Sequence, residues 1–493
     1  MKKTMFLTLS TFLLGLVSCS ESVLETPQEK PEVTARGLFP NKVEICWNEE
    51  GQTIDGFGVA QADWATSLFT HSKRDEVAAL LFGSDGLNVN MLRGEIFPHY
   101  WENENDTTFN TDDNVDMPLS DPYFNSPEGN DLRRRGQLWV SKVAQQRYHV
   151  DNLIFSTWTP PAFMKSNGST SKGSLKPEYY QRFAEYLAKF YKAYKDAGLN
   201  VYSISPVNEP NYETADWNSC KWTEQQLADF IVNNMGPTFR SEGVNAKIMF
   251  GELAQWHEII LGSAVSAKSY VEKVIQSNPK VTEYAHIAAG HGYNLPNIDL
   301  IQFPIVPWDV AASKGLKVWL TEISTTMDTF DPSIGNGVYW AEVFYKYLVD
   351  AKVNAICWWA GARPADHNEP LIQLNDNSYV VTKRFDTYGN YTRYIKPGSV
   401  RINAKKGLGV SYNLLVSSFK KDNQYIVVAV NKSSKEVTTT LNLKDATTNG
   451  ALKQYLTDAN NRWTESEVQR ANDGTYSITL PPSSVVTYIG TAN

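Results

Sequence analysis

The sequence has few cysteines and no block of basic residues. Its 493 residues include four cysteines, none in a Cys-x-x-Cys or Cys/His spacing typical of zinc sites. One of the four lies in the N-terminal leader, and the odd, scattered remainder (Cys46, Cys220 and Cys357) does not indicate a disulfide framework. The net charge is -8, and nucleic-acid binding normally needs a basic surface. We therefore expect no metal, no cofactor and no nucleic-acid partner.

Long apolar runs are also scarce, and the one that stands out is near the N-terminus. Basic residues precede MFLTLSTFLLGLV, a run typical of a signal peptide and too short for a transmembrane helix. The run closes on LVSC, which resembles the bacterial lipobox, where cleavage leaves Cys19 as an acylated first residue. Residues 1–19 are thus predicted to be a lipoprotein signal, and the polar, proline-bearing residues 20–42 a flexible linker.

This leader predicts where the protein resides. A lipid on Cys19 would anchor it in the bacterial cell envelope, periplasmic or at the cell surface, with the lipid as its contact with the membrane. The alternative is an ordinary secretory signal in which the cysteine stands by chance. A monomer is expected.

Short β-rich runs alternate with helical stretches from residue 56 to 397. Residues 177–198 carry apolar side chains on one helical face between an initial proline and a final glycine. Comparable helical patterns cover 131–149, 223–241, 263–277 and 337–351. The β-rich runs are DGFGVAQ, LNVNMLRG, DNLIFSTWTP, NVYSISPVNEP, AKIMFGEL, AHIAAGHGY, KVWLTEIS and AICWWAGA. Eight such strands predict a (β/α)8 TIM barrel. A doubly wound sheet is the alternative, but the first run lacks a following glycine-rich phosphate loop.

The pattern changes after residue 397. Residues 398–493 contain short strands separated by turn residues, which predict a β-sandwich side domain, and residues 43–55 are expected to add strands to it. This domain is either a structural appendage or a carbohydrate-binding module. Its few candidate exposed aromatics favour the structural interpretation.

Two of the predicted barrel strands end on glutamate. Glu209 ends the fourth run and Glu322 the seventh, and catalytic side chains of such barrels lie at the carboxyl ends of strands. Pro210 cannot donate a ladder hydrogen bond and is expected to stop the fourth strand there. The two strands face each other across the barrel, so the carboxyl groups can stand about 5–5.5 Å apart, the spacing of retaining glycoside hydrolysis. The pair therefore predicts a glycosidase, and two ion-paired strand-end residues are the structural alternative.

An ordered set of motifs resembles glycoside hydrolase family 30. They are QTIDGFG, FSTWTPPAFMK, YSISPVNEPNY, HGY, VWLTEIS, ICWWAG and YIKPGSVRI, and the resemblance runs from about residue 43 to the C-terminus. It implies a barrel with a side β-sandwich made from both chain ends. It also implies Glu209 as acid/base, Glu322 as nucleophile and Asn208 as a ligand of the sugar 2-hydroxyl.

Aromatic and basic residues at the predicted mouth match family positions around the sugar whose bond is cleaved. Trp158 ends strand 3, His291 and Tyr293 end strand 6, and Trp359 ends strand 8. Tyr293 is expected to hydrogen-bond the nucleophile, and Trp359 to form an apolar floor. Each of these could instead belong to the core, which is the assignment for Trp358, on the other side of its strand.

Two further positions complete the predicted mouth. Arg93, ending strand 2, is expected to pair with a catalytic carboxylate and keep it charged. Trp64, after strand 1, is expected to form a wall of the pocket. The long insertion after strand 2 carries Tyr100, Trp101 and Tyr123, which are expected to close one end of the cleft and favour exo action.

The specificity predicted from the resemblance is for a neutral glycan. The chain is most similar to the branch that includes xylanases acting on glucuronic-acid-decorated xylan, which use an arginine after strand 7. The corresponding STTMDTFDPSIGNGVYW has no arginine. Arg363 could substitute, or could pair with Asp366 or Glu369. We expect a retaining β-glycosidase acting on plant or microbial polysaccharide or oligosaccharide of the xylan type. The alternatives are a β-1,6-glucanase, β-glucosidase, β-fucosidase or inactive carbohydrate-binding protein.

Overall fold

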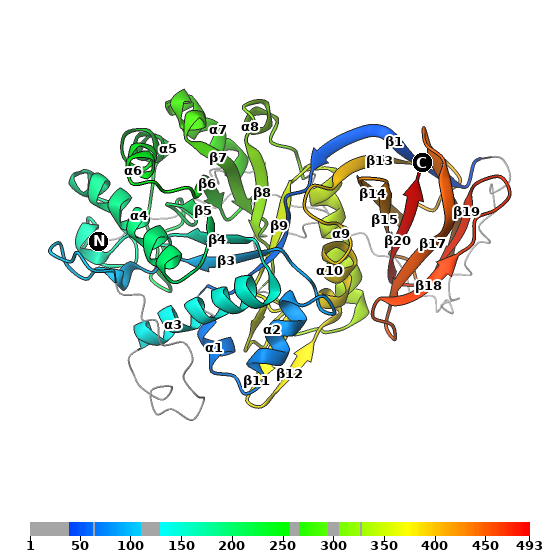
Figure 1. Cartoon of the computed structure of the whole chain (residues 1–493), viewed down its shortest axis with the longest axis horizontal. Coiled ribbons are helices and arrows are strands. Elements are labelled where there is room, and N and C mark those ends of the chain that lie inside the picture. The colour runs from blue at the N-terminus through cyan, green and yellow to red at the C-terminus, as the bar shows by residue number, and fades with distance from the viewer. Residues whose placement is uncertain (1–38, 63–64, 110–128, 257–265, 294–304, 326–327) are drawn as a thin grey trace, which may run out of the picture.

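The computed structural model describes residues 39–62, 65–109, 129–256, 266–293, 305–325 and 328–493. Figure 1 shows two bodies side by side, a barrel surrounded by helices and a β-rich domain that holds the C-terminus. The leader with Cys19, together with Trp64 and Tyr123, lies outside the described residues. In the described part of the chain, no helix is long and apolar enough to span a lipid bilayer.

The barrel is closed by eight parallel strands in chain order, and β9 pairs with β2 to complete it. All eight predicted runs form its strands, which confirms the predicted fold class. The strands are β2 (Gly56–Ala60), β3 (Met91–Glu95), β4 (Asn152–Ser156), β5 (Val201–Ser205), β6 (Lys247–Leu253), β7 (Ala285–His291), β8 (Lys317–Glu322) and β9 (Ala355–Trp359).

Helices cover the outside of the barrel. They are α1 (Ala65–Phe69), α2 (Arg74–Phe82), α3 (Gly129–Lys142), α4 (Tyr180–Asp196), α5 (Glu224–Phe230), α6 (Gly236–Ser241), α7 (Ala267–Ser277), α8 (Asp309–Ser313), α9 (Ile334–Val349) and α10 (Lys383–Thr392). The stretch predicted as one helix over 223–241 begins in a capping box between Thr223 and Gln226 and is interrupted by a π-helical turn at Ile231–Met235.

Two apolar layers hold the barrel together. Its interior is filled by residues that include Met91, Ile154, Ile287 and Trp319, all buried. A larger cluster lies between strands and helices, where residues such as Phe183, Leu187 and Phe190 of α4 pack inward. Apolar side chains therefore fill both the barrel interior and the space between its strands and helices.

The side domain is one continuous sheet of nine strands around a second apolar core. In sheet order the strands are β18 (Thr464–Val468), β17 (Thr448–Thr457), β20 (Ser484–Ala492), β15 (Gln424–Asn431), β14 (Leu414–Lys421), β13 (Val400–Lys406), β1 (Lys42–Thr53), β16 (Val437–Lys444) and β19 (Tyr476–Leu480). The N-terminal β1 pairs antiparallel with β13 and parallel with β16, so both ends of the described chain enter this sheet.

Some strands were not predicted from the sequence. In β17 the ladder shifts register between Asn449 and Lys453, near Gly450 with φ +69°, and β18 is almost wholly exposed. Neither therefore has a clear apolar alternation. After β9 the chain also forms a small sheet of β10 (Ala362–Arg363), β11 (Ile372–Asn375) and β12 (Ser378–Val381).

The two bodies are joined through α9 and α10, which lie between them in Figure 1. Asn390 of α10 donates to Thr487 Oγ1 of β20 at 3.1 Å, and the Trp463 indole donates to the Asp386 carbonyl at 2.7 Å. The side domain is thus attached to the barrel by buried polar contacts as well as by packing.

Candidate active site

Glu209 and Glu322 both lie at the carboxyl end of the barrel, but different local structures hold them there. Glu322 is the last residue of β8. The expectation that Pro210 stops the other strand is wrong, because β5 already ends at Ser205. There the Ser205 hydroxyl donates to the Val207 carbonyl at 2.9 Å, a local bond that competes with the ladder.

Beyond the end of β5, Glu209 is held by a backbone hydrogen bond to the neighbouring strand β6. Its backbone N–H donates to the carbonyl of Glu252 at 2.9 Å. Glu209 and Glu252 both adopt left-handed backbone conformations, with φ of +47° and +53° respectively. Non-glycine residues rarely do so, and such strain is concentrated at functional sites.

The two predicted catalytic carboxylates are close. One oxygen of each, together with a ring nitrogen of His291, lies within 4.8 Å of the others. His291 Nδ1 is 3.2 Å from Glu209 Oε1 and 3.4 Å from Glu322 Oε2. His291 is the ladder partner of Glu322 on β7, which explains its position. The separation is that of retaining glycosidases rather than the ~6.5–9.5 Å of inverting ones.

Glu322 is surrounded by hydrogen-bond donors. Arg93 Nη1 donates to its Oε1, and the Tyr293 hydroxyl donates to its Oε2 at 2.7 Å. Burial raises the pKa of the Glu322 carboxyl, whereas the positive charges of His291 and Arg93 oppose that rise. Both Arg93 and Tyr293 thus make the contacts expected of them, although Arg93 lies within β3, two residues before its end.

Arg93 also binds a third carboxylate that sequence reasoning missed. Its Nη2 donates to Glu252 Oε1 at 3.0 Å and to Asn208 Oδ1 at 2.7 Å. Burial opposes ionisation, but Arg93 and His291 lower the pKa of Glu252 to about 2. The signal was present in the sequence, since Glu252 stands near the end of the fifth predicted strand. The contact with Arg93 leaves the Asn208 NH2 group as the donor for a sugar hydroxyl.

His291 is completely buried among these carboxylates. Burial alone would lower its pKa, but the charges of Glu322, Glu209 and Glu252 raise the pKa of His291 to about 9. It is therefore a cation at neutral pH. Glu209, His291 and Glu322 are spaced as metal ligands could be, and the same spacing places the His291 ring between the two carboxylates, an arrangement suited to acid–base chemistry.

Two tryptophans border this cluster. The Arg93 guanidinium lies 4.8 Å from the centroid of a Trp158 ring, and Trp158 and Trp359 are 5.9 Å apart. Trp358 is fully buried and its indole donates to the Glu369 carbonyl at 2.7 Å, so its assignment to the core is confirmed.

Arg363 and the insertion after β3 differ from the functional expectations. Arg363 pairs with the buried Glu369, one of the two structural alternatives. Tyr100 and Trp101 do not close a cleft, because both are buried against α4, where Trp101 stacks edge-on with Tyr186. The cleft-wall interpretation of these two residues is therefore wrong.

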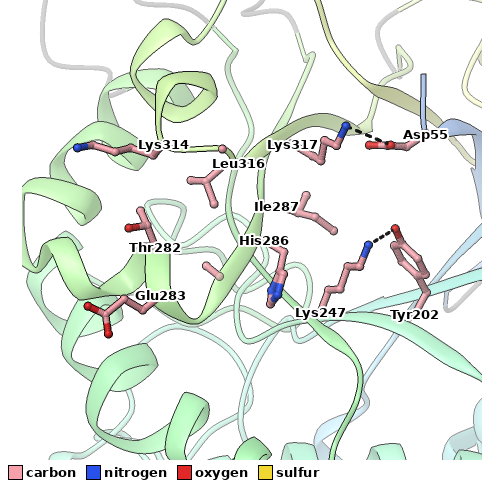
Figure 2. A pocket seen from close by; sticks show the side chains of 12 residues that line it. Asp55, Tyr202, Lys247, Thr282, Glu283, His286, Ile287, Lys314, Leu316 and Lys317 are labelled. Carbon is pink, nitrogen blue, oxygen red and sulfur yellow. Dashed lines mark hydrogen bonds and ion pairs between the residues drawn. The ribbon is translucent and has the colours of Figure 1, made fainter. Parts of the chain in front are cut away.

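Figure 2 shows a hollow at the opposite, amino-terminal end of the barrel strands. Its lining includes Lys247, bonded to the Tyr202 hydroxyl at 2.6 Å, and Lys317, paired with Asp55 at 3.7 Å. These charges already have partners, and this end of a TIM barrel generally serves stability. The chemistry is therefore assigned to the carboxyl end.

Comparison with known proteins agrees with this geometry. Residues 40–373 match the family described as O-glycosyl hydrolase family 30, and residues 398–488 match the glycosyl hydrolase family 30 beta sandwich domain. The chain belongs to glycoside hydrolase family 30. This family 30 enzyme is a glycoside hydrolase with a TIM barrel and a side β-sandwich.

Relatives of this family 30 enzyme have several specificities. It is 25% identical over 364 residues to a glucuronoxylanase of Bacillus subtilis, covering 71% of this chain and 77% of the relative. It is also 25% identical over 415 residues to an endo-1,6-β-D-glucanase of Neurospora crassa, covering 80% and 82%. The catalytic domain of xylanase C from Talaromyces cellulolyticus shares the fold, with a TM-score of 0.74, 23% identity, and coverage of 91% of this chain and 100% of that one.

Proposed function

We propose that this enzyme is a retaining β-glycosidase that acts by double displacement, with Glu322 as nucleophile and Glu209 as acid/base. The observation that carries the proposal is the separation of their oxygens, within 4.8 Å. The surroundings differ in the way the two roles need. Glu322 accepts bonds from Arg93 and Tyr293, whereas Glu209 is the more exposed carboxylate, at 13% against 4%.

In the first step Glu322 attacks the anomeric carbon while Glu209 gives its proton to the leaving oxygen. The contacts with Arg93 and Tyr293 hold the Glu322 carboxylate in place to attack the face of the sugar ring opposite to Glu209. The Asn208 NH2 group donates to the adjacent sugar hydroxyl, whose hydrogen bonds strengthen in the transition state. In the second step Glu209 removes a proton from water, which cleaves the glycosyl ester on Glu322 and returns both groups to their starting states.

The buried charges remain balanced through both steps. The proposed mechanism starts from an ionised Glu322 and a protonated Glu209, so that Glu252 and Glu322 together offset the cations Arg93 and His291. In the ester intermediate Glu322 is neutral, but Glu209 has become the second anion. Because the cluster is nearly excluded from water, a constant net charge avoids the cost of an unpaired buried ion.

The proposed substrate is a neutral xylan-type chain or oligomer. The resemblance to a glucuronoxylanase supports xylose. The missing arginine after β8 and the pairing of Arg363 with Glu369 argue against recognition of an acidic side group by either position. β-1,6-Glucan is the second candidate, because the Neurospora crassa glucanase is an equally identical relative over a longer segment.

Proton NMR of the first-formed anomer tests the mechanism, because a retaining enzyme must release the β anomer first and an α-first product contradicts the proposal. Paired assays on xylo-oligosaccharides with and without glucuronic acid test specificity. We expect kcat/KM to differ by less than about tenfold between them. A hundredfold preference for decorated chains, or turnover of β-1,6-glucan alone, would contradict the neutral xylan assignment.

We also propose that the enzyme is anchored to the bacterial envelope by a lipid on Cys19. The support is the apolar leader that ends in LVSC, followed by a polar, proline-bearing stretch. Cys19→Ser should leave the precursor unprocessed or move the enzyme from the detergent phase to the soluble fraction. An unchanged detergent partition would contradict lipidation.

A further inference from the structure

Two aromatic rings are exposed just beyond Glu209. Tyr212 and Trp217 are 47% and 44% exposed, and their rings stack with centroids 5.6 Å apart and an interplanar angle of 17°. Trp222, ten residues beyond Tyr212, is only 3% exposed. The segment from residue 210 to 222 can therefore bury an aromatic side chain. The exposed rings of Tyr212 and Trp217, in contrast, present an apolar surface that a ligand would cover.

The backbone under these rings is held at several points. The Trp222 N–H donates to the Pro210 carbonyl at 3.0 Å, which closes the base of the 210–222 loop. The Ser219 carbonyl accepts from the buried Lys165 ammonium at 2.7 Å. The Trp217 carbonyl accepts from the Ser171 hydroxyl at 3.1 Å. A loop fixed in this way presents the rings without a large ordering cost when a ligand binds.

The loop also begins at the acid/base. The Tyr212 N–H donates to the Glu209 carbonyl at 2.9 Å, so one tight turn separates Tyr212 from the proton donor, and Trp217 is placed there by its stacking on Tyr212. In the proposed reaction Glu209 contacts the glycosidic oxygen, which leaves with the departing sugar. Residues attached to Glu209 by a single turn are therefore placed on the leaving-group side of the cleaved bond.

We infer that Tyr212 and Trp217 form a binding platform for the leaving-group sugar of a neutral β-linked oligosaccharide. This inference rests on the proposed function, since it uses the role of Glu209. The stacked rings offer an apolar surface to the C–H face of a pyranose. The polar residues Asn211, Glu213 and Asp216 adjoin the two rings in the sequence, are exposed, and suit hydroxyl groups at the rim of the sugar.

The test compares substrates with and without a leaving-group ring. Kinetics of wild type and Trp217→Ala are measured on xylohexaose, on a β-1,6-linked glucohexaose and on β-xylosyl and β-glucosyl fluorides, whose leaving group is fluoride. We expect KM for the hydrolysed hexaose to rise on the order of tenfold in Trp217→Ala, with less than twofold change in kcat/KM on the fluoride. Tyr212→Ala should act in the same direction, and Trp217→Phe should recover most of the loss.

Tyr412, 81% exposed in the side domain, provides the matched control. Tyr412→Ala should change neither substrate class. An equal loss on hexaose and fluoride in Trp217→Ala would show a structural role and overturn the platform. Wild-type kinetics of Trp217→Ala on both hexaoses would also overturn it. In that case, if the wild type still cleaved the fluorides, the binding platform alone would be refuted and the proposed function would stand. A wild type inactive on all of these glycosides would refute the proposed function and the platform together.

Discussion

The mouth of the barrel and the interior of the side domain are both buried, but they bury different kinds of polar group. In the mouth, Arg93, Glu252 and His291 are fully buried and charged. From residue 398 onward, the buried polar residues that the structure describes are serines, threonines and one asparagine. Thr448 illustrates the second pattern, with 2.7 and 2.8 Å hydrogen bonds to the hydroxyls of Tyr425 and Tyr476.

This difference separates a site built for chemistry from a domain built for stability. Buried hydroxyl and amide groups are inexpensive once they are hydrogen-bonded, whereas buried charges are costly even when paired. A protein that keeps five ionisable groups together at one end of a barrel therefore keeps them for a reaction. The comparison predicts that substitutions in the mouth change activity more than stability, and substitutions in the side domain the reverse.

The largest expected effect is that of Glu322→Gln. It should reduce kcat by at least about 10⁴-fold, because the amide cannot form the glycosyl ester. Glu369→Gln is the matched control, since Glu369 is also a buried glutamate paired with an arginine but lies outside the cluster. It should cost less than about tenfold in kcat. Equal losses in the two variants would show that any buried ion pair near the barrel mouth is required.

Glu209→Ala should have the next largest effect and should depend on the substrate. Activity on an oligosaccharide should fall about 10²–10⁴-fold, the usual contribution of a general acid. A dinitrophenyl glycoside, which needs no proton to leave, should retain most of its rate in the first step. Azide should then accelerate turnover by attacking the intermediate. Equal inactivity of Glu209→Ala on both substrates, without an azide response, would contradict the assigned role.

Glu252→Gln should lower kcat about 10–100-fold with little change in KM, because Glu252 acts through Arg93 and His291 rather than on substrate. The loss of one negative charge should also lower the pKa of His291, which histidine NMR detects. Glu342→Gln is the control, since Glu342 pairs with Lys432 of the side domain at 2.6 Å. It should affect stability alone. An unchanged His291 titration in Glu252→Gln would show that this carboxylate does not tune the site.

The same charges predict how stability depends on pH. The pKa of His291 is raised to about 9, so its stabilising contribution is complete below its ordinary pKa near 6.5 and is lost as pH rises through 9. The pKa of Glu252 is lowered to about 2, so its contribution is complete above about 4.5 and is lost as pH falls through 2. Both contributions are complete between these limits, from about pH 4.5 to 6.5.

His291→Gln tests this pH dependence. Urea unfolding at pH 6 and pH 9 should show a smaller loss of stability on the alkaline side for the variant than for wild type. Parallel pH curves for the two proteins would mean that the histidine is not charged in the folded state.

The smallest effect on activity is expected from the side domain. Ile478→Ala, at a fully buried position of β19, should lower the free energy of unfolding by about 2–5 kcal/mol and leave kcat within twofold. Ile154→Ala is the matched barrel variant, equally buried and in register with Arg93. It should cause a similar loss of stability and also lower kcat about tenfold, because a small displacement of Arg93 disturbs the nucleophile. Equal kcat values for both variants would remove the distinction between the two regions.

Much of the barrel could be predicted because its signals are local. A strand such as β8 shows itself as an apolar run, and Glu322 interrupts that run at the end of the strand. The same rule applied to β6 would have found Glu252. Its role is not visible from the local sequence, because it lies in contacts with Arg93 and His291, 159 and 39 residues away.

The sequence by itself determined the alternation of eight strands and helices, the side domain, and the two glutamates at strand ends, because each depends on residues near one another in the chain. Tertiary structure decided the rest. Burial against α4 removed Tyr100 and Trp101 from any cleft, and Glu369 engaged Arg363. Barrel closure brought Arg93, Glu252 and His291 together from three strands, and only their mutual charges in a site nearly free of water determine which of them is ionised.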